Sequence, residues 1–282
     1  MNLLSIQSHV ACGHVGNSAA VFPLQRIGIE VWPVNTVQFS NHTGYGEWRG
    51  RVFSGEDIRL VVQGIEECGV LGECDGVLSG YLGSPDIGQA VVDAVARVKT
   101  ANPAARYCCD PVIGNAERGV FVHSGIPEFI KERMLPIADV ITPNLFELEY
   151  LAGRGAATLT DLAAAIDAVH ALGPRVVLVT SVHTGETPDG CIDLVASDDT
   201  GRCRLRTPWL PVVANGAGDV VAALFFAHYL QNGSAAEALS RAASSIFGVL
   251  SRTAEAGSRE MLLVDAQQEF VAPSQMFEAH RI

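Results

Sequence analysis

The stretch Asn215-Gly216-Ala217-Gly218-Asp219, followed directly by the apolar run Val220-Val221-Ala222-Ala223-Leu224-Phe225-Phe226, decides how the rest of the chain is interpreted. Small residues leave backbone N–H groups free where the apolar run predicts the start of a helix, and the helix dipole favours negative charge there. The stretch therefore predicts a phosphate site. Asp219 either caps this helix or takes a proton from a hydroxyl group that attacks the phosphate. The second role is the chemistry of a small-molecule kinase, although glycines and an aspartate also begin helices that bind nothing.

The composition of the 282-residue chain excludes several classes of protein. Lys and Arg total 19 against 31 Asp and Glu, a net charge of -12, and no basic stripe is present for nucleic acid or an anionic membrane surface. No apolar stretch reaches the ~18 residues of a membrane span. The seven cysteines are odd in number and lack paired metal-ligand spacing, which favours a reduced, cytoplasmic setting. We expect one domain over residues 1–282.

Short apolar segments alternate with longer segments of helical spacing. Strands are predicted at residues 3–7, 30–35, 76–79, 106–109, 139–142 and 176–181. Helices are predicted between them, at residues 16–27, 56–68, 85–99, 145–151 and 162–172. This alternation predicts an α/β fold, with a mostly parallel sheet and helices on both of its faces. Two further strands, at residues 191–196 and 203–207, form a β insertion that we expect to flank a nucleotide, and helices follow at residues 218–230 and 235–252.

Polar residues follow five successive predicted strands. In an open α/β sheet, ligands bind beyond the carboxyl ends of the strands, so these residues are candidates for a site. They include Ser8, His42, Tyr81, Asp110 and Glu147. Taken singly, each has a plain alternative: Ser8 could cap a turn, His42 could bond a loop carbonyl, and Glu147 could be a solvated acid.

Several longer runs are more specific than any single polar residue. They are SIQSHV at residues 5–10, GHVGNSAA at 13–20, WPVNTVQFSNHT at 32–43, LSGYLG at 78–83, CDPVIG at 109–114, TPNLFELE at 142–149 and GAGD at 216–219. Together they resemble pyridoxal kinases of the ribokinase-like superfamily, and most of all the bacterial PdxY type. The resemblance implies a three-layer α/β/α sandwich whose mostly parallel sheet carries small β insertions.

The same resemblance implies an activity and its partners. The expected reaction is ATP-dependent phosphorylation of the 5′-hydroxyl of pyridoxal to pyridoxal 5′-phosphate, in vitamin B6 salvage, with pyridoxamine and pyridoxine as further candidate substrates. ATP is the expected co-substrate, Mg²⁺ the expected cofactor and a homodimer the expected assembly. Mg²⁺ keeps most of its waters and needs only one or two carboxylates beside the phosphates, which suits the acidic residues of these runs.

Roles for individual residues also follow from the resemblance. Asp219 is the expected catalytic base, and Gly216, Ala217 and Gly218 form the expected anion hole. The expected vitamer-binding residues are Ser8, His42, Thr43, Gly44, Tyr81 and Asp219. The expected ATP-binding residues are Asp110, Thr142, Glu147, Thr180, Thr207, Pro208, Trp209 and Leu210, of which Asp110 and Glu147 also hold the metal.

Thr180 departs from the family pattern, because many PdxY-type members carry a lysine there that reaches ATP. Threonine donates one hydrogen bond but no charge, so lower activity is expected. Candidates to restore the charge are Arg202, Arg204, Arg206 and His183.

Two other functions remain open. One is a different ribokinase-like kinase, for hydroxymethylpyrimidine or a sugar, although residues 13–17 fit the first poorly. The other is a vitamer-binding protein with weak catalysis, which only Thr180 favours.

Overall fold

The computed structural model describes residues 1–212 and 214–282, and its centre is a ten-stranded sheet in the order β12-β11-β10-β9-β8-β5-β4-β1-β2-β3. The central strands pair in parallel; they are β1 (Asn2–Cys12), β2 (Glu30–Asn41), β4 (Cys74–Ser79), β5 (Arg106–Cys109), β8 (Val140–Ile141) and β9 (Val176–Val182). Antiparallel strands extend both edges; they are β3 (Gly50–Val52), β10 (Cys191–Asp198), β11 (Gly201–Pro208) and β12 (His280–Arg281).

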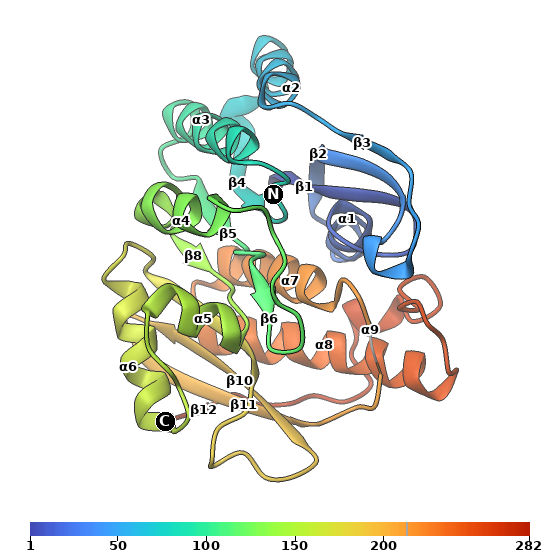
Figure 1. Ribbon diagram of the computed structural model, residues 1–282, viewed down its shortest axis with the longest axis vertical. Helices are drawn as coiled ribbons and strands as arrows, with labels where there is room; N and C mark the ends of the chain where they lie inside the picture. Colours follow the sequence, from blue (N-terminus) through green and yellow to red (C-terminus); the bar gives the residue numbers. More distant parts are fainter. Residues whose placement is uncertain (213) are drawn as a thin grey trace.

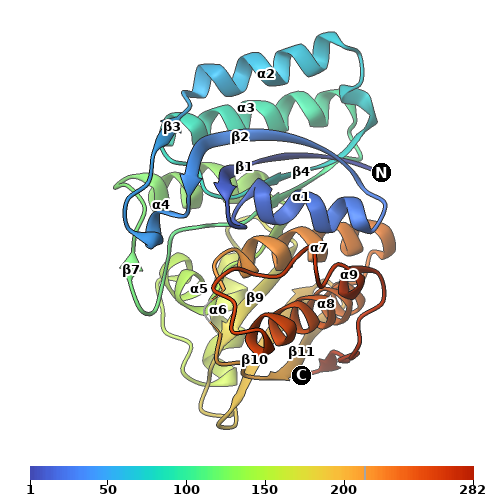
Figure 2. The same cartoon turned by 90° about the vertical axis from the view of Figure 1, so that its right-hand side faces the viewer.

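Helices cover both faces of the sheet (Figures 1 and 2). One apolar core lies beneath α2 (Gly55–Glu67), α3 (Pro85–Ala101), α4 (Ile126–Phe129), α5 (Leu145–Ala152) and α6 (Leu159–His170). The other lies beneath α1 (Asn17–Arg26), α7 (Ala217–Asn232), α8 (Ala235–Glu255) and α9 (Gln268–Val271). The predicted three-layer α/β/α arrangement is therefore confirmed.

The helix starts follow from local sequence. Ser54 and Asp57 form a capping box at the start of α2, and Ser84 caps α3, which has proline at its first position. Asn144 and Glu147 form a second capping box at the start of α5. Such caps satisfy backbone N–H groups that have no partner within the helix. Helix α7 has Gly216 at its N-cap position, so no side chain at that position caps it.

Strands β1 and β2 are much longer than predicted, and this is the main correction to the expected fold. Residues 8–10 and 36–41, predicted to be loops, lie inside these strands. The two strands continue to pair after a register shift between Gln7 and His9, and β3 pairs with residues 37–39. The extension buries a small apolar cluster of Val10, Val37 and Phe39, and this burial explains why the strands continue.

Several short elements were not predicted. Strands β6 (Gly114–Asn115) and β7 (Gly119–Val120) form a separate two-stranded sheet, the β6–β7 hairpin, which stands apart from the main sheet in Figure 2. Residues 126–137 form α4, η3 (Ile130–Met134) and η4 (Leu135–Ile137). Two further short turns of helix are η1 (Thr43–Tyr45) and η2 (Leu71–Glu73). The other predicted elements agree with the structure to within a few residues.

All seven cysteines are free thiols. Within residues 1–212 and 214–282, no helix combines the length and the apolar character that crossing a membrane would need.

Candidate active site

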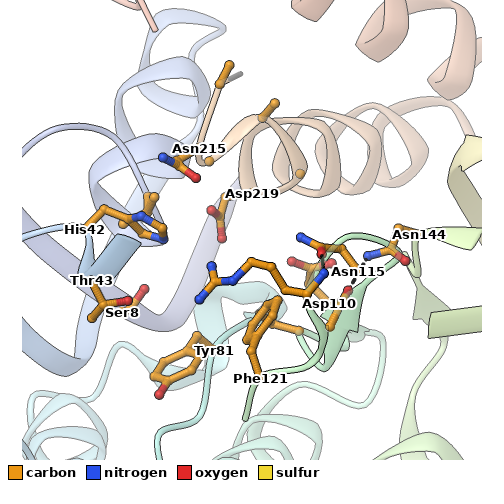
Figure 3. A pocket seen from close by; sticks show the side chains of 18 of the residues that line it. Ser8, His42, Thr43, Tyr81, Asp110, Asn115, Phe121, Asn144, Asn215 and Asp219 are labelled. Carbon is orange, nitrogen blue, oxygen red and sulfur yellow. Dashed lines mark hydrogen bonds between the residues drawn. The ribbon is translucent and has the colours of Figure 1, made fainter. Parts of the chain in front are cut away.

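A cavity of about 460 Å³ lies where the parallel strands end and α7 begins, and Figure 3 shows the side chains around it. Its volume is in the range of small-ligand sites. Most of the predicted site residues line it; they are Ser8, His42, Thr43, Tyr81, Asp110, Thr142, Glu147, Thr180, Gly216, Ala217, Gly218 and Asp219. Gly44 is the exception among the predicted vitamer residues, because its N–H donates to His42 Nδ1 at 3.2 Å and it does not line the cavity. The sheet order thus brings together segments that are far apart in sequence.

The loop before α7 has the backbone that an anion site needs. Gly216 is left-handed, with φ of 85°, and a Cβ atom there would collide with the carbonyl oxygen of His14. Gly218 differs, because a Cβ atom on it would meet only open space. The first residues of α7 therefore line the cavity at the positive end of the helix, where the N–H of Ala217 donates to the Ala214 carbonyl at 3.4 Å.

Asp219 lies in the first turn of α7, and Figure 3 shows its carboxylate pointing into the cavity. The N-cap position of α7 is Gly216, and the Asp219 carboxylate accepts a hydrogen bond from its own N–H in the first turn, so Asp219 helps to cap the helix as well as facing the cavity. Burial raises the pKa of Asp219 to about 6, and hydrogen bonds from the N–H groups of Gly16 and of Asp219 itself oppose the rise. Gly16 is also left-handed, and a side chain there would collide with the carbonyl of Ser8. Asp219 is thus a carboxyl group poised to accept a proton near neutral pH.

Asp110 and Thr142 lie on the opposite wall, directly after β5 and β8. The Thr142 hydroxyl donates to Asp110 Oδ1 at 2.8 Å, and both residues are buried. Burial, followed by the charges of Asp219 and Glu147, raises the pKa of Asp110 well above its usual value. Like charges in one cavity disfavour the ionised form of Asp110, and the described residues contain no group of three or more His, Cys, Asp or Glu side chains that could hold a metal ion.

Glu147 is buried and is held by backbone N–H groups, so it is not the solvated acid of the plain alternative. Its Oε1 accepts from the N–H groups of Ile113 at 2.9 Å and Gly114 at 3.2 Å, and its Oε2 accepts from Asn144 at 2.9 Å. Burial raises the pKa of Glu147 to about 7 against these hydrogen bonds. The side chain therefore ties the start of α5 to the β6–β7 hairpin.

The third wall comes from the extended strands. Ser8 lies on β1, while His42 and Thr43 lie just past β2, and Figure 3 shows these three near one another, with Tyr81 below them. The Thr36 hydroxyl donates to the Tyr81 carbonyl at 2.9 Å and so fixes the segment after β4. Burial lowers the pKa of His42, and the charge of Arg118 lowers it further. Neutral polar groups and an aromatic ring suit a small heteroaromatic ligand.

A second cavity of about 210 Å³ adjoins the first and shares Thr180, Ser181, Ala217 and Gly218 with it. The predicted ATP-binding residues of the β insertion line it; they are Thr207, Pro208, Trp209 and Leu210. Its remaining lining is largely apolar, from β10, α7 and α8. The structure therefore brings the two predicted groups of ligand residues to adjoining cavities that meet at the start of α7.

None of the four basic residues proposed to restore the charge at position 180 is placed to do so. Arg202 pairs with Asp167, and Arg206 pairs with Asp193. Arg204 and His183 line neither cavity.

Comparison with known proteins places the chain in a family. A family model described as phosphomethylpyrimidine kinase matches residues 61–263. A pyridoxal kinase PdxY of Granulibacter bethesdensis is 56% identical over 283 residues, covering 99% of this chain and 99% of that protein. Another, from Leifsonia xyli, is 55% identical and covers 100% of both chains. The chain belongs to the PdxY-type pyridoxal kinases. The predicted family is thereby confirmed.

One solved structure resembles this chain along its whole length. It is pyridoxal kinase from Leishmania donovani in complex with ADP and pyridoxamine, with a TM-score of 0.91 and 29% identity. The match covers 100% of this chain and 99% of that chain. The predicted ribokinase-like fold agrees with this likeness.

Three residues that line the larger cavity, Arg118, Phe121 and Ser181, are not indicated by the sequence. Arg118 lies in the turn of the β6–β7 hairpin and Phe121 follows the hairpin directly, and that hairpin was not predicted. The turn lies between Asn115 and Gly119, and a glycine at position 119, which is left-handed with φ of 66°, is the sequence signal that could have revealed it. Ser181 is a left-handed non-glycine residue, with φ of 54°, which no sequence pattern indicates.

Proposed function

We propose that the protein transfers the γ-phosphoryl group of ATP to the 5′-hydroxyl of pyridoxal, giving pyridoxal 5′-phosphate in vitamin B6 salvage. Pyridoxamine and pyridoxine are further candidate acceptors. The observation that carries the proposal is the position of Asp219 in the first turn of α7, where the two cavities adjoin. A hydroxyl group in the larger cavity and a nucleotide in the smaller one would meet at this carboxylate.

In this proposal Asp219 accepts the proton of the attacking 5′-hydroxyl, while the N–H groups of Gly216, Ala217 and Gly218 bind phosphate oxygens. Positioned bases contribute roughly 10²–10⁴ in rate. Phosphoryl transfer depends mainly on alignment and on neutralising charge, so a rigid helix start beside a fixed base suits it. Ser8, His42, Thr43 and Tyr81 orient the vitamer ring, and Thr207 to Leu210 contact the nucleotide.

Mg²⁺ is the proposed metal, because hard oxygen ligands beside phosphates are what it requires. Asp110 uses Oδ1 for Thr142, and its Oδ2 has no hydrogen-bond partner among residues 1–212 and 214–282. Both oxygens of Glu147 already accept backbone N–H bonds, so Asp110 is the stronger candidate ligand and Glu147 supports it. When bound, the ion would neutralise charge on the polyphosphate.

The direct test is a phosphorylation assay with ATP and Mg²⁺, read by mass spectrometry, across pyridoxal, pyridoxamine, pyridoxine, hydroxymethylpyrimidine and ribose. The proposal predicts a mass gain of one phosphoryl group on at least pyridoxal. The phosphomethylpyrimidine kinase match makes hydroxymethylpyrimidine the most informative competitor. Product from hydroxymethylpyrimidine or ribose, with none from any vitamer, would contradict the proposal.

We also propose a homodimer in a reducing, cytoplasmic compartment. Support for the dimer comes from family likeness and from exposed apolar side chains on β3 and α2, namely Val52, Leu60 and Val61, each about half exposed. Support for the compartment comes from the seven free thiols. Light scattering on the parent and on Leu60→Glu tests the dimer, which should weaken in the variant.

A further inference from the structure

Arg118 is the only Lys or Arg that lines the larger cavity among the residues that the structure describes. Three carboxyl groups line the same cavity, those of Asp110, Glu147 and Asp219. ATP would bring further negative charge to this place, in a chain whose net charge is already -12. One basic side chain in such surroundings is therefore a strong candidate for contact with phosphate.

The β6–β7 hairpin holds Arg118 in a defined position. The Arg118 N–H donates to Asn115 Oδ1 at 2.9 Å across the turn. At the hairpin base, Gly114 donates its N–H to Glu147, and its carbonyl accepts from Asn144 Nδ2 at 2.8 Å. A side chain at Gly114 would collide with the Gly119 carbonyl, so the two strands lie very close together. The hairpin is thus anchored to the start of α5, beside the proposed metal ligands.

The guanidinium group has no carboxylate partner within the described part of the chain, and its neighbour is an aromatic ring. Its Cζ lies 5.0 Å from the centroid of Phe121, whose ring also lines the cavity and is visible in Figure 3. Stacking on a ring fixes the plane of an arginine while its N–H donors remain free. Arg118 is solvent-exposed, so these donors are accessible to a ligand.

The charge of Arg118 reaches across the cavity. It is the second largest cause of the lowered pKa of His42, which belongs to the opposite, vitamer-facing wall. Arg118 and His42 line the same cavity, one from the β6–β7 hairpin and the other from the segment after β2, so the guanidinium group lies within electrostatic reach of the vitamer-facing wall.

We propose that Arg118 is a further catalytic residue, which binds the phosphoryl group during its transfer from the side opposite to the N–H groups of α7. This inference rests on the proposed kinase function and names an additional group for the same site. The charge of the phosphoryl group in flight is spread over three equatorial oxygens. The planar guanidinium, with five N–H donors, can bond two of them at once. It would supply the positive charge that Thr180 does not.

The test compares Arg118→Ala, Arg118→Lys and the parent, with saturating Mg²⁺. Loss of one preorganised donor to a transition-state oxygen typically costs ~10²–10³ in kcat. We expect a loss of this size in Arg118→Ala, with the Kd of pyridoxal within about twofold of the parent, because the proposed contact is with the phosphoryl group and not with the vitamer. Arg118→Lys should recover part of the loss, since lysine keeps the charge but not the fork.

Arg133→Ala is the matched control. Arg133 is also an exposed arginine over a phenylalanine ring, 6.0 Å from the centroid of Phe129, but it does not line either cavity. Its removal should leave kcat unchanged.

The possible results distinguish a failure of the proposed role of Arg118 from a failure of the proposed kinase function. If the parent phosphorylates no vitamer, the function itself fails, and the inference fails with it. If the parent is active and Arg118→Ala has a kcat within about twofold of it, only the inference is wrong. Equal losses in the Ala and Lys variants, together with a lower Tm than the parent, would show that Arg118 only stabilises the hairpin and would also overturn the inference.

Discussion

The buried carboxyl group of Asp219 lowers the stability of the folded protein at neutral pH. Burial raises its pKa to about 6, so the folded protein binds this proton more tightly than the unfolded chain, whose aspartates titrate near ~4. The unfolded state therefore loses the proton first as pH rises. The free energy of unfolding therefore decreases between pH ~4 and about 6. Above that range Asp219 causes no further decrease.

Asp219→Asn should therefore raise the Tm of the ligand-free protein at pH 8, by roughly 2–4 °C, and should leave it near the parent value at pH 4. The amide is neutral at both pH values, so it avoids the cost of a buried charge. Thermal unfolding followed by circular dichroism across this range measures the difference. Glu255→Gln, which removes an exposed acid, is the control and should show no such trend. A Tm difference that does not depend on pH would contradict the burial argument.

Glu147→Gln should destabilise the protein by about 1–3 kcal/mol, because an amide has one acceptor oxygen where the carboxylate uses two for three backbone N–H groups. At least one buried N–H of the hairpin base or of α5 loses its partner. Urea unfolding measures the change, with Glu132→Gln on an exposed helical position as control.

A Mg²⁺ titration of the same variant separates the two roles of Glu147. Disorder of the hairpin should lower kcat even at saturating Mg²⁺, whereas a role only in metal binding would be rescued by more Mg²⁺. Stability equal to the parent would refute the anchoring role.

At the start of helix α7, a single substitution should change the kinetics without lowering the stability of the protein. Gly218 is a helical residue whose Cβ position is open space, so Gly218→Ala should fold at least as stably as the parent. The new methyl group would occupy the space in which a phosphate oxygen is proposed to lie. We expect KM for ATP to rise or kcat to fall roughly tenfold or more while Tm is maintained.

Gly64→Ala is the matched control for this prediction. Gly64 lies inside α2, and its Cβ position is also open, far from either cavity. The substitution should stabilise the protein by roughly 0.5–1 kcal/mol and leave turnover unchanged. Kinetics of Gly218→Ala that match those of Gly64→Ala would argue against an anion hole at this helix start.

The elements that were predicted well are those whose signal is local. Strand β9 is apolar at nearly every position, and its helical neighbours carry clear caps and spacing, so their bounds follow from the sequence. Strands β1 and β2 continue past their apolar segments because they pair with each other and with β3, which is a long-range effect. The β6–β7 hairpin is too short to have a periodicity of its own. Arg118 was missed for that reason, whereas Asp219 and Asp110 follow predicted motifs.

At the scale of the whole molecule, the order of the sheet assembles the site. Strand β1 lies between β2 and β4, so Ser8 lines the same cavity as segments that follow β4 and β5. The antiparallel strands β10 and β11 add the wall of the smaller cavity at the other side. Helix α7 begins where the two cavities adjoin, and this explains why the glycine-rich stretch is decisive for both fold and function.

Contacts from distant parts of the chain also join the segment after β2 to the loop before α7. Asn215 Nδ2 lies 3.5 Å from the hydroxyl of Tyr45, at the end of η1. Arg259 Cζ lies 4.0 Å from the centroid of the Tyr45 ring. The segment after α8 thus supports the loop that closes one side of the cavity.

In the proposed mechanism, Asp219 takes the proton of a vitamer hydroxyl group beside a phosphate held at the start of α7. The most direct measurement is the single-turnover rate of pyridoxal phosphorylation by Asp219→Asn and by the parent, with saturating ATP and Mg²⁺, alongside the Kd of pyridoxal for both. We expect the rate of the variant to be lower by roughly 10²–10⁴, with a Kd within about twofold of the parent value, because the amide keeps the shape of the side chain but cannot accept the proton. A variant that phosphorylates pyridoxal at nearly the parent rate would show that Asp219 is not the base.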